Sequence, residues 1–249
     1  MSDTNNTSLT MFLEGVSQLG LALSDSQLEQ FLTYRTELLD WNTRMNLTAI
    51  TNPEEVLLRH FLDSLTLLPL IDKPHLRLLD IGTGAGFPGL PLKIVRPQWS
   101  VTLLEATGKK VTFVNHVIDT LHLTDVIAVH GRAEELAHKR EYRAKFDVVT
   151  ARAVAAIPTL LEYSAPYCRV GGFIIFPKKG DLTEELTQGK QAAKLVGAAF
   201  KAEKTLSLPG LSDERSLFVW EQRKLCLSQY PRSGAAMAKK PLYEKNSFS

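Results

Sequence analysis

The chain has 249 residues, of which 44% are hydrophobic and 22% are charged, and its formal net charge is +2. This composition is that of a globular protein and allows one large domain, or one domain with an appendage. Two cysteines argue against a disulfide framework. The charged residues inside the most apolar region, 56–71, exclude a membrane span there, and no signal peptide is apparent. We therefore expect a cytoplasmic protein with no membrane partner.

The small net charge hides an asymmetry along the chain. Residues 1–75 contain 4 Lys and Arg against 10 Asp and Glu, a balance of −6. Residues 76–249 contain the remaining 25 against 17, a balance of +8. A polyanion is therefore expected to meet the second part of the chain.

Residues 1–75 are predicted to form a helical N-terminal extension. Residues 1–8 are polar, and we expect no regular structure in them. From there on, apolar residues recur at helical spacing. Ser24 with Gln27 resembles a capping box, and Asn52-Pro53 combines a helix cap with a proline at the first helical position.

From Leu76 the pattern changes to strands that alternate with helices. Strands are predicted at 76–81, 101–104, 126–129, 146–150, 173–176, 201–207 and 216–221, and helices at 109–121, 157–168 and 181–196. Such alternation predicts an α/β fold, here a doubly wound, seven-stranded, mostly parallel sheet that closes with a hairpin. The expected division is a helical extension at 1–75, a sheet domain at 76–222 and a basic tail at 223–249.

A glycine turn follows the first strand and precedes a helix that begins near Pro88. Gly82, Gly84 and Gly86 allow positive φ angles and a close approach of a ligand to the backbone. Gly84, Gly86 and Gly89 satisfy the dinucleotide pattern G-x-G-x-x-G, whereas Gly82, Gly84 and Gly86 look like the first motif of S-adenosylmethionine (SAM) methyltransferases. Asp80 would repel a pyrophosphate but suits the ammonium group of SAM, so it favours the second reading.

Two further acidic positions follow strands at the edge where such sheets bind ligands. Glu105 ends the second strand, about 20 residues after the turn, where an acid accepts hydrogen bonds from ribose hydroxyls. Ala133-Glu134 follows the third strand, and its backbone N–H with its carboxylate could contact the edge of a purine. Glu135 is an equally suitable acid by composition.

Basic residues follow the fourth and fifth strands. Arg152 could hold a carboxylate or a phosphate in a forked pair, and a surface salt bridge is the alternative. Lys178 and Lys179 face the same edge, where a solvated pair of lysines is the alternative. His60 is expected to have a core or capping role.

Several catalytic signatures are missing from the sequence. No His or Cys cluster has metal-ligand spacing, so no metal is expected, and no nucleophile elbow occurs. Cys168 is expected on a helix, which disfavours a cytosine-C5 nucleophile, and the signature of exocyclic-amine methylation is missing after the fourth strand. Guanine N7 carries no proton, so its methylation requires positioning rather than a general base. No catalytic residue is assigned.

A set of motifs occurs together along most of the chain. They are Asn46-Leu-Thr, Arg59-His-Phe-Leu-Asp-Ser-Leu, Asp80-Ile-Gly-Thr-Gly-Ala-Gly-Phe-Pro-Gly-Leu-Pro-Leu-Lys, Lys109-Lys110, Arg132-Ala-Glu, Arg152-Ala-Val and Tyr230-Pro-Arg. Together they resemble the RsmG (GidB) family of bacterial small-subunit ribosomal RNA methyltransferases.

The resemblance implies SAM-dependent methylation of guanine N7 in a decoding-region loop of 16S rRNA, with S-adenosylhomocysteine as the product. The partner would be 16S rRNA or the small ribosomal subunit particle. Matching motifs imply cofactor binding by Gly82, Phe87, Glu105, Ala106, Thr107, Ala133, Glu134 and Arg152, with support from Asp80, Gly84 and Gly86. Many relatives have Asp where this chain has Glu105. Rival functions are a small-molecule methyltransferase, an NAD-dependent oxidoreductase and a non-catalytic SAM-sensing RNA binder.

The end of the chain has a strongly basic composition. Residues 222–249 contain six Lys and Arg against the single acid Glu244, and Tyr230, Tyr243 and Phe248 offer stacking surfaces. This composition predicts RNA contact, and a basic tail without a partner is the alternative. Deletion of the residues after Leu227 is expected to lower RNA affinity while SAM binding persists.

Overall fold

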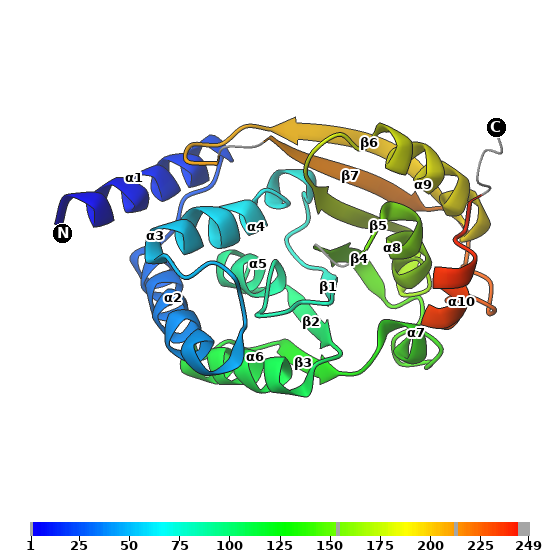
Figure 1. The fold of residues 1–249 in the computed structure, drawn as a ribbon, viewed down its shortest axis with the longest axis horizontal. Helices are drawn as coiled ribbons and strands as arrows, with labels where there is room; N and C mark the ends of the chain where they lie inside the picture. Colours follow the sequence, from blue (N-terminus) through cyan, green and yellow to red (C-terminus); the bar gives the residue numbers. More distant parts are fainter. Residues whose placement is uncertain (1, 153–154, 212–213, 244–249) are drawn as a thin grey trace.

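A seven-stranded sheet forms the centre of the computed structural model, which describes residues 2–152, 155–211 and 214–243, with side chains from residue 7 onward (Figure 1). The strand order is β3-β2-β1-β4-β5-β7-β6. The strands are β1 (Arg77–Ile81), β2 (Ser100–Glu105), β3 (Val126–His130), β4 (Phe146–Ala151), β5 (Cys168–Lys178), β6 (Ala198–Leu206) and β7 (Arg215–Gln222). Strands β1 to β5 pair in parallel, and β7 pairs antiparallel with both β5 and β6. The predicted seven-stranded, mostly parallel sheet with a closing hairpin is confirmed.

Helices cover both faces of this sheet. They are α1 (Ser2–Gln18), α2 (Asp25–Met45), α3 (Pro53–Val56), η1 (Leu57–Leu62), α4 (Asp63–Leu65), η2 (Leu68–Leu70), α5 (Gly89–Val95), α6 (Gly108–Thr120), α7 (Ala133–Leu136), α8 (Ile157–Ser164), α9 (Thr183–Leu195) and α10 (Gly234–Lys239). Alternate strand residues point to opposite faces, so Leu78 belongs to one buried cluster and Leu79 to the other. Because both faces are covered, β1 is apolar at consecutive positions.

The N-terminal helices join the core on one face of the sheet. Helix α2 packs against α5 and α6, and it satisfies carbonyl groups near their C-terminal ends. The side-chain amide of Gln27 donates to the Ile94 carbonyl at 2.8 Å, and that of Gln30 donates to the Leu121 carbonyl at 3.1 Å. The extension at 1–75 therefore shares its core with the sheet, and the expected domain boundary stays a prediction.

The helix starts predicted in this extension are confirmed by their caps. Ser24 and Gln27 form a reciprocal capping box at the start of α2. The Asn52 side chain accepts the backbone N–H of Glu54 at 2.8 Å, and Pro53 is the first residue of α3. The expectation of no regular structure in residues 1–8 was wrong for residues 2–8, because α1 begins at Ser2.

The predicted helix over 157–168 is too long at its end, and Cys168 is not on a helix. Helix α8 ends at Ser164, and Cys168 is the first residue of β5, where it pairs with Phe146. Pro166 explains the early end, because its ring supplies no N–H for a helical hydrogen bond. Buried Cys168 has a pKa raised to about 12 by desolvation, so its thiol stays protonated.

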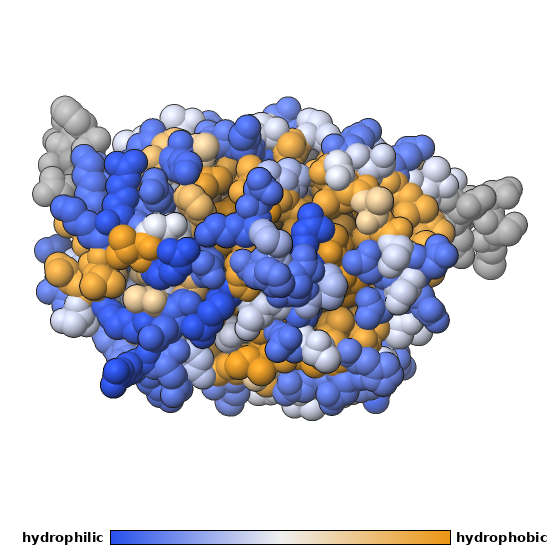
Figure 2. Space-filling view, turned by 180° about the vertical axis from the view of Figure 1, so that it is seen from behind, coloured by the Kyte–Doolittle hydropathy of each residue, from blue (hydrophilic) through white to orange (hydrophobic). Residues whose placement is uncertain are grey.

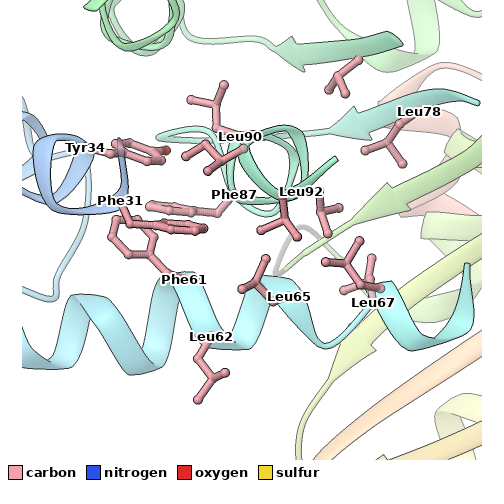
Figure 3. Close-up of a cluster of buried hydrophobic side chains, with 14 of the residues drawn as sticks. Phe31, Tyr34, Phe61, Leu62, Leu65, Leu67, Leu78, Phe87, Leu90 and Leu92 are labelled. Atoms are coloured by element: carbon pink, nitrogen blue, oxygen red, sulfur yellow. The ribbon is translucent and has the colours of Figure 1, made fainter. Parts of the chain in front are cut away.

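Aromatic rings join the N-terminal helices to the glycine turn (Figure 3). Tyr34 of α2 stacks on Phe87 with ring centroids 5.4 Å apart, and Phe61 of η1 lies 5.1 Å from Tyr34. Phe31 also belongs to the cluster, with its ring centroid 5.1 Å from that of Phe61. The turn that follows β1 therefore rests on side chains that come from two helices of the first 75 residues.

The described part of the C-terminal region, residues 223–243, lies against the opposite end of the sheet domain. Figure 1 shows α10 beside α7 and α8. Tyr230 and Leu242 are buried in the same cluster as Leu136 of α7. Lys245 and Phe248, to which the sequence assigned part of the RNA-binding surface, lie outside the described residues, as does Glu244.

The surface mixes polar and apolar side chains. Figure 2 shows hydrophilic residues over most of one face, with apolar residues exposed between them in several separate places. Within the described ranges, none of the helices combines the length and the apolar character that a bilayer crossing requires.

Candidate functional site

The turn between β1 and α5 takes its shape from glycines with positive φ angles. Gly82, Gly84 and Gly86 have φ angles of 67°, 63° and 99°. A Cβ atom on Gly86 would lie 2.5 Å from both Leu90 Cδ1 and the Tyr34 hydroxyl oxygen, so packing as well as φ requires glycine there. A Cβ on Gly84 would meet no atom within 4 Å. The backbone at Gly84 is therefore open to a ligand.

Asp80 lies fully buried beneath this turn. Its Oδ2 accepts the Gly89 N–H at 2.9 Å and the Thr83 hydroxyl at 2.6 Å. Its Oδ1 has no hydrogen-bond partner among the residues that the structure describes. Burial raises the pKa of Asp80 to about 6, against the lowering effect of the two hydrogen bonds. This oxygen is buried without a partner, and a cationic group such as the ammonium of SAM would satisfy it.

Glu105 connects the glycine turn to the loop that follows β2. Its Oε2 accepts the Gly84 N–H at 3.0 Å, and its Oε1 accepts the Thr107 N–H at 2.8 Å. The side chain is buried but reaches an adjacent cavity. Each carboxylate oxygen can accept a second hydrogen bond, so Glu105 could hold two ribose hydroxyls without losing either backbone contact.

A cavity of about 270 Å³ brings five of the eleven predicted cofactor residues together. Its lining consists of Ile81, Gly82, Leu104, Glu105, Ala106, Gly131, Arg132, Ala133, Glu134 and Tyr163. The volume is close to the lower limit of small-molecule sites, roughly 300 Å³. Thr107, Phe87 and Arg152 are not part of this lining. The cavity has two carboxylates, one arginine and apolar walls, which suits a nucleoside.

Of the two candidate acids in α7, Glu134 lines the cavity, whereas Glu135 is exposed outside it. The carbonyl of Ala133 accepts the hydroxyl of buried Tyr167 at 2.6 Å, which ties the start of α7 to the sheet. Helix α7 is only four residues long, so its position depends on such contacts.

A second cavity, of about 400 Å³, lies at the ends of β4 and β5. Its lining consists of Ile50, Arg59, His60, Asp63, Arg152, Pro177, Lys178, Lys179 and Arg215. Five of these nine residues are basic and one is acidic. An anion is therefore the expected occupant.

Arg152, which follows β4, forms a salt bridge that is largely buried and not at the surface. Its Nη1 donates to Asp63 Oδ2 at 2.9 Å, and its guanidinium lies over the Phe87 ring, 5.1 Å from the centroid. Arg215 donates to the other oxygen of Asp63. Two arginines on one buried carboxylate leave a net positive charge in the cavity. The next two residues of the Arg152-Ala-Val motif, 153 and 154, lie outside the described ranges.

His60 lies in this second cavity rather than only in the core. Its ring stacks on Phe87 with centroids 4.5 Å apart, its Nδ1 is 3.4 Å from Arg152 Nη2, and its Nε2 is 2.7 Å from the Thr48 hydroxyl oxygen. Burial and Arg152 lower the pKa of His60 to about 3. The ring is therefore neutral, with Nδ1 accepting from Arg152 and Nε2–H donating to Thr48.

Lys178 is held in place, and this was not foreseen from the sequence. Its ammonium donates to the Ala155 carbonyl at 2.8 Å and to Glu185 Oε1 at 2.6 Å.

Asp63, Arg215 and Tyr34 are three more residues that sequence reasoning missed. Asp63 and His60 did stand in a motif quoted for the family, Arg59-His-Phe-Leu-Asp, which was the available signal. Arg215 had no such signal.

No group of three or more His, Cys, Asp or Glu side chains in the described parts of the chain could hold a metal ion. The glycine turn, the free oxygen of Asp80 and the nucleoside-sized cavity with Glu105 instead fit SAM.

The sheet order and the site together define the class of protein, a SAM-dependent methyltransferase of the Rossmann-like kind. The fold is shared with the solved structure of TYW2 from P. horikoshii in complex with MeSAdo, at a TM-score of 0.50 and 15% identity, over 62% of this chain and 60% of that one. The predicted class and its cofactor are confirmed.

The GidB family, described as rRNA small subunit methyltransferase G, matches residues 27–217. Proteins named "Ribosomal RNA small subunit methyltransferase G" are 45% identical in Lachnoclostridium phytofermentans and 47% identical in Dehalococcoides mccartyi. The matches cover 94% and 92% of this chain, and 97% of each relative. The chain belongs to the GidB family, which confirms the resemblance seen in its motifs.

Glu105→Ala should weaken binding of S-adenosylhomocysteine by about 100-fold. The change removes the proposed ribose contact and leaves the Gly84 and Thr107 N–H groups without their carboxylate partner. Glu135→Ala is the matched control, because Glu135 is exposed and outside the cavity. Calorimetric titration measures both affinities, and equal affinities would remove Glu105 from the site.

Cofactor affinity should fall about tenfold between pH 7 and pH 5. An ammonium near Asp80 Oδ1 favours the ionised carboxylate, whereas the unliganded protein protonates it near pH 6. The same raised pKa affects the stability of the fold. Without ligand, protonated Asp80 contributes to the free energy of unfolding at low pH, and this contribution is lost as the pH rises from about 4 through 6. Asp80→Asn should bind weakly at both pH values. A pH-dependent affinity that survives in this variant would assign the effect to another group.

Proposed function

We propose that the chain transfers the methyl group of SAM to N7 of a guanine in 16S rRNA of the small ribosomal subunit. The observation that carries the proposal is a pair of cavities of opposite character on the two sides of one glycine turn. The acidic cavity is the one that contains Glu105 and Glu134, and the basic cavity is the one that contains five Lys and Arg residues. Gly82 lines the acidic cavity, and the Phe87 ring supports the guanidinium of Arg152 in the basic cavity. The cationic methyl donor and the anionic RNA acceptor would thus meet at this turn, where only residues 82–87 separate the two cavities.

The acidic cavity, together with Asp80 beneath the glycine turn, provides a group for each part of the cofactor. Glu105 would accept from the ribose hydroxyls, Glu134 from the adenine amino group, and Asp80 from the ammonium group. Gly82 and Gly84 leave room for the ligand beside the turn, whereas Gly86 lets the turn pack against Leu90 and Tyr34. Ala106, Thr107 and Ala133 provide backbone around its base and sugar. When bound, SAM supplies an electrophilic methyl group on a sulfonium centre.

The basic cavity provides groups for a nucleotide. Ile50 and Pro177 give apolar surface on which the faces of a base could pack. Arg59 and Lys179 bring positive charge toward its phosphate groups, and Arg152 stands between the two ligands. Arg152 could therefore bind either the cofactor carboxylate or an RNA phosphate.

Among the described residues that line this cavity, neither His60 nor Asp63 is free to act as a general base, which is consistent with N7 chemistry. Both nitrogens of His60 are engaged, and its low pKa keeps it neutral. Both oxygens of Asp63 are bound to arginines. N7 of guanine loses no proton before it attacks the methyl group, so alignment and the exclusion of water are the required contributions.

The proposed partner is 16S rRNA, free or in an assembled small-subunit particle, and the proposed location is the cytoplasm, where that RNA resides. The family name supports the RNA, and the basic cavity supports an anionic acceptor.

Mapping of 7-methylguanine in 16S rRNA tests the function directly. RNA from cells that lack the gene should lose one such modification, and the purified protein with methyl-labelled SAM should restore it. Free 16S rRNA and purified small subunits, offered separately, show which of the two is the substrate. Label that appears only in small molecules, or in no product at all, would contradict the proposal.

Arg59→Gln should raise the KM for RNA about tenfold and reduce its salt dependence by the contribution of about one phosphate, with cofactor affinity unchanged. Arg59 lines the basic cavity, and its contact with Glu55 is exposed and long, at 3.4 Å. Arg44→Gln is the matched control, because Arg44 has a similar exposed i,i+4 partner, Asp40, away from the cavity. Equal KM values for the two variants would remove Arg59 from the RNA site.

A further inference from the structure

The Tyr230-Pro-Arg232 motif has no role in the cavities described above, yet it is held by many contacts. Arg232 forms a forked pair with Glu162 of α8, with Nε to Oε1 and Nη2 to Oε2 both at 2.7 Å. The backbone N–H of Arg232 donates to the same carboxylate at 2.9 Å. The Glu162 side chain is only 1% exposed. Arg232 is thus held by a buried carboxylate through its backbone N–H and two of its guanidinium nitrogens, while its side chain stays partly exposed.

A second arginine fixes the chain just before this motif. Arg143 donates to the carbonyl groups of Cys226, Leu227 and Tyr230 at 2.7–2.9 Å, and to the carbonyl of Ala137, which follows α7, at 3.1 Å. His138 Nε2 lies 2.9 Å from the Pro231 carbonyl oxygen. The segment 226–231 is therefore fastened to the segment that contains α7.

The same segment reaches the wall of the acidic cavity. Glu162 directly precedes Tyr163, which lines that cavity. At the start of α10, a Cβ atom on Gly234 would lie 3.3 Å from Glu134 Oε1 and 3.9 Å from the Tyr163 hydroxyl oxygen. Residues 232–234 thus stand behind the two side chains that close the cavity on the α7 and α8 side.

We propose that the C-terminal segment 226–242 is the outer wall of the cofactor site, and that Arg232 is a positioning residue that holds Tyr163 and Glu134 in place for the adenosine. The proposal rests on the proposed cofactor contacts and extends them to a part of the chain whose composition suggested RNA binding. Without the ion pair, α8 and the start of α10 lose their fixed spacing, and the nucleoside loses a rigid wall. The buried Glu162 would also be left without a cationic partner.

Calorimetric titration of the full chain with S-adenosylhomocysteine tests the ion pair. Arg232→Gln should weaken binding at least tenfold, and Arg232→Lys, which keeps the charge but loses the fork, should restore part of the affinity. Lys240→Gln, an exposed change in the same segment, should bind as the wild type does. In turnover assays Arg232→Gln should raise the KM for SAM and leave the KM for RNA unchanged.

A second pair of variants tests the wall without touching the ion pair. Gly234→Val pushes side-chain atoms against Glu134 and should also weaken S-adenosylhomocysteine binding, whereas Ala235→Val, at the neighbouring exposed position of α10, should not. This pair decides the question if Arg232→Gln does not fold. Deletion of the residues after Leu227 should abolish cofactor binding, in contrast to the expectation from composition.

Wild-type affinity for S-adenosylhomocysteine in folded Arg232→Gln and in Gly234→Val would overturn the proposal. So would a loss of RNA affinity alone, because it would assign the segment to the RNA surface. Failure of the wild-type protein to bind S-adenosylhomocysteine would instead contradict the proposed function.

Discussion

The stack of rings on Phe87 is the contact on which the rest of the site depends. Tyr34 packs on the Phe87 ring, and its hydroxyl donates to the carbonyl of Ala85 in the glycine turn. His60 also stacks on Phe87, and the Arg152 guanidinium lies over it. One side chain thus joins the N-terminal helices, the turn and the basic cavity. A displacement of α2 or η1 would move both the glycine turn at which the cofactor binds and Arg152, which stands between the cofactor and the RNA.

The two cavities differ in charge because different strand ends contribute to them. β2 and helix α7, which follows β3, bring Glu105 and Glu134 to one side of the turn, whereas β4, β5 and β7 bring Arg152, Lys178 and Arg215 to the other. This division matches the charges of a cationic methyl donor and a polyanionic acceptor. Asp63 holds two arginines together in the basic cavity, where mutual repulsion would otherwise separate them. The N-terminal helices therefore complete the acceptor side, in addition to covering the sheet.

Some basic and aromatic residues of the described C-terminal segment are engaged within the protein, and the RNA contact that its composition predicts stays a prediction. Arg232 is paired with a buried carboxylate, and Arg223 lies 3.7 Å from Glu221. Tyr230, considered from the sequence as a stacking surface, is 7% exposed and packs in the core beneath α7. Figure 1 shows the segment returning to the helices that border the cofactor cavity. Its contacts give it a structural reason to remain ordered when no RNA is bound.

The sequence by itself determined the features that depend on neighbouring residues. The alternation of strands and helices, the capping box at Ser24, the proline start at Pro53 and the glycine turn follow from backbone preferences within a few positions. The placement of Gly82, Glu105 and Glu134 at one cavity followed from the rule that parallel strands end at the same edge.

Only the tertiary structure decided which side chains meet. Asp63 binds Arg152 from 89 residues away and Arg215 from 152 residues away, and Glu162 binds Arg232 across 70 residues. No local pattern specifies such a pair, because a charged residue has the same appearance in the sequence whether it faces solvent or a buried partner. Pro166, by contrast, could have been used to end the helix before Cys168. The chemistry of the cofactor turn is thus encoded locally, whereas the acceptor cavity and the C-terminal wall exist only once distant segments have packed together.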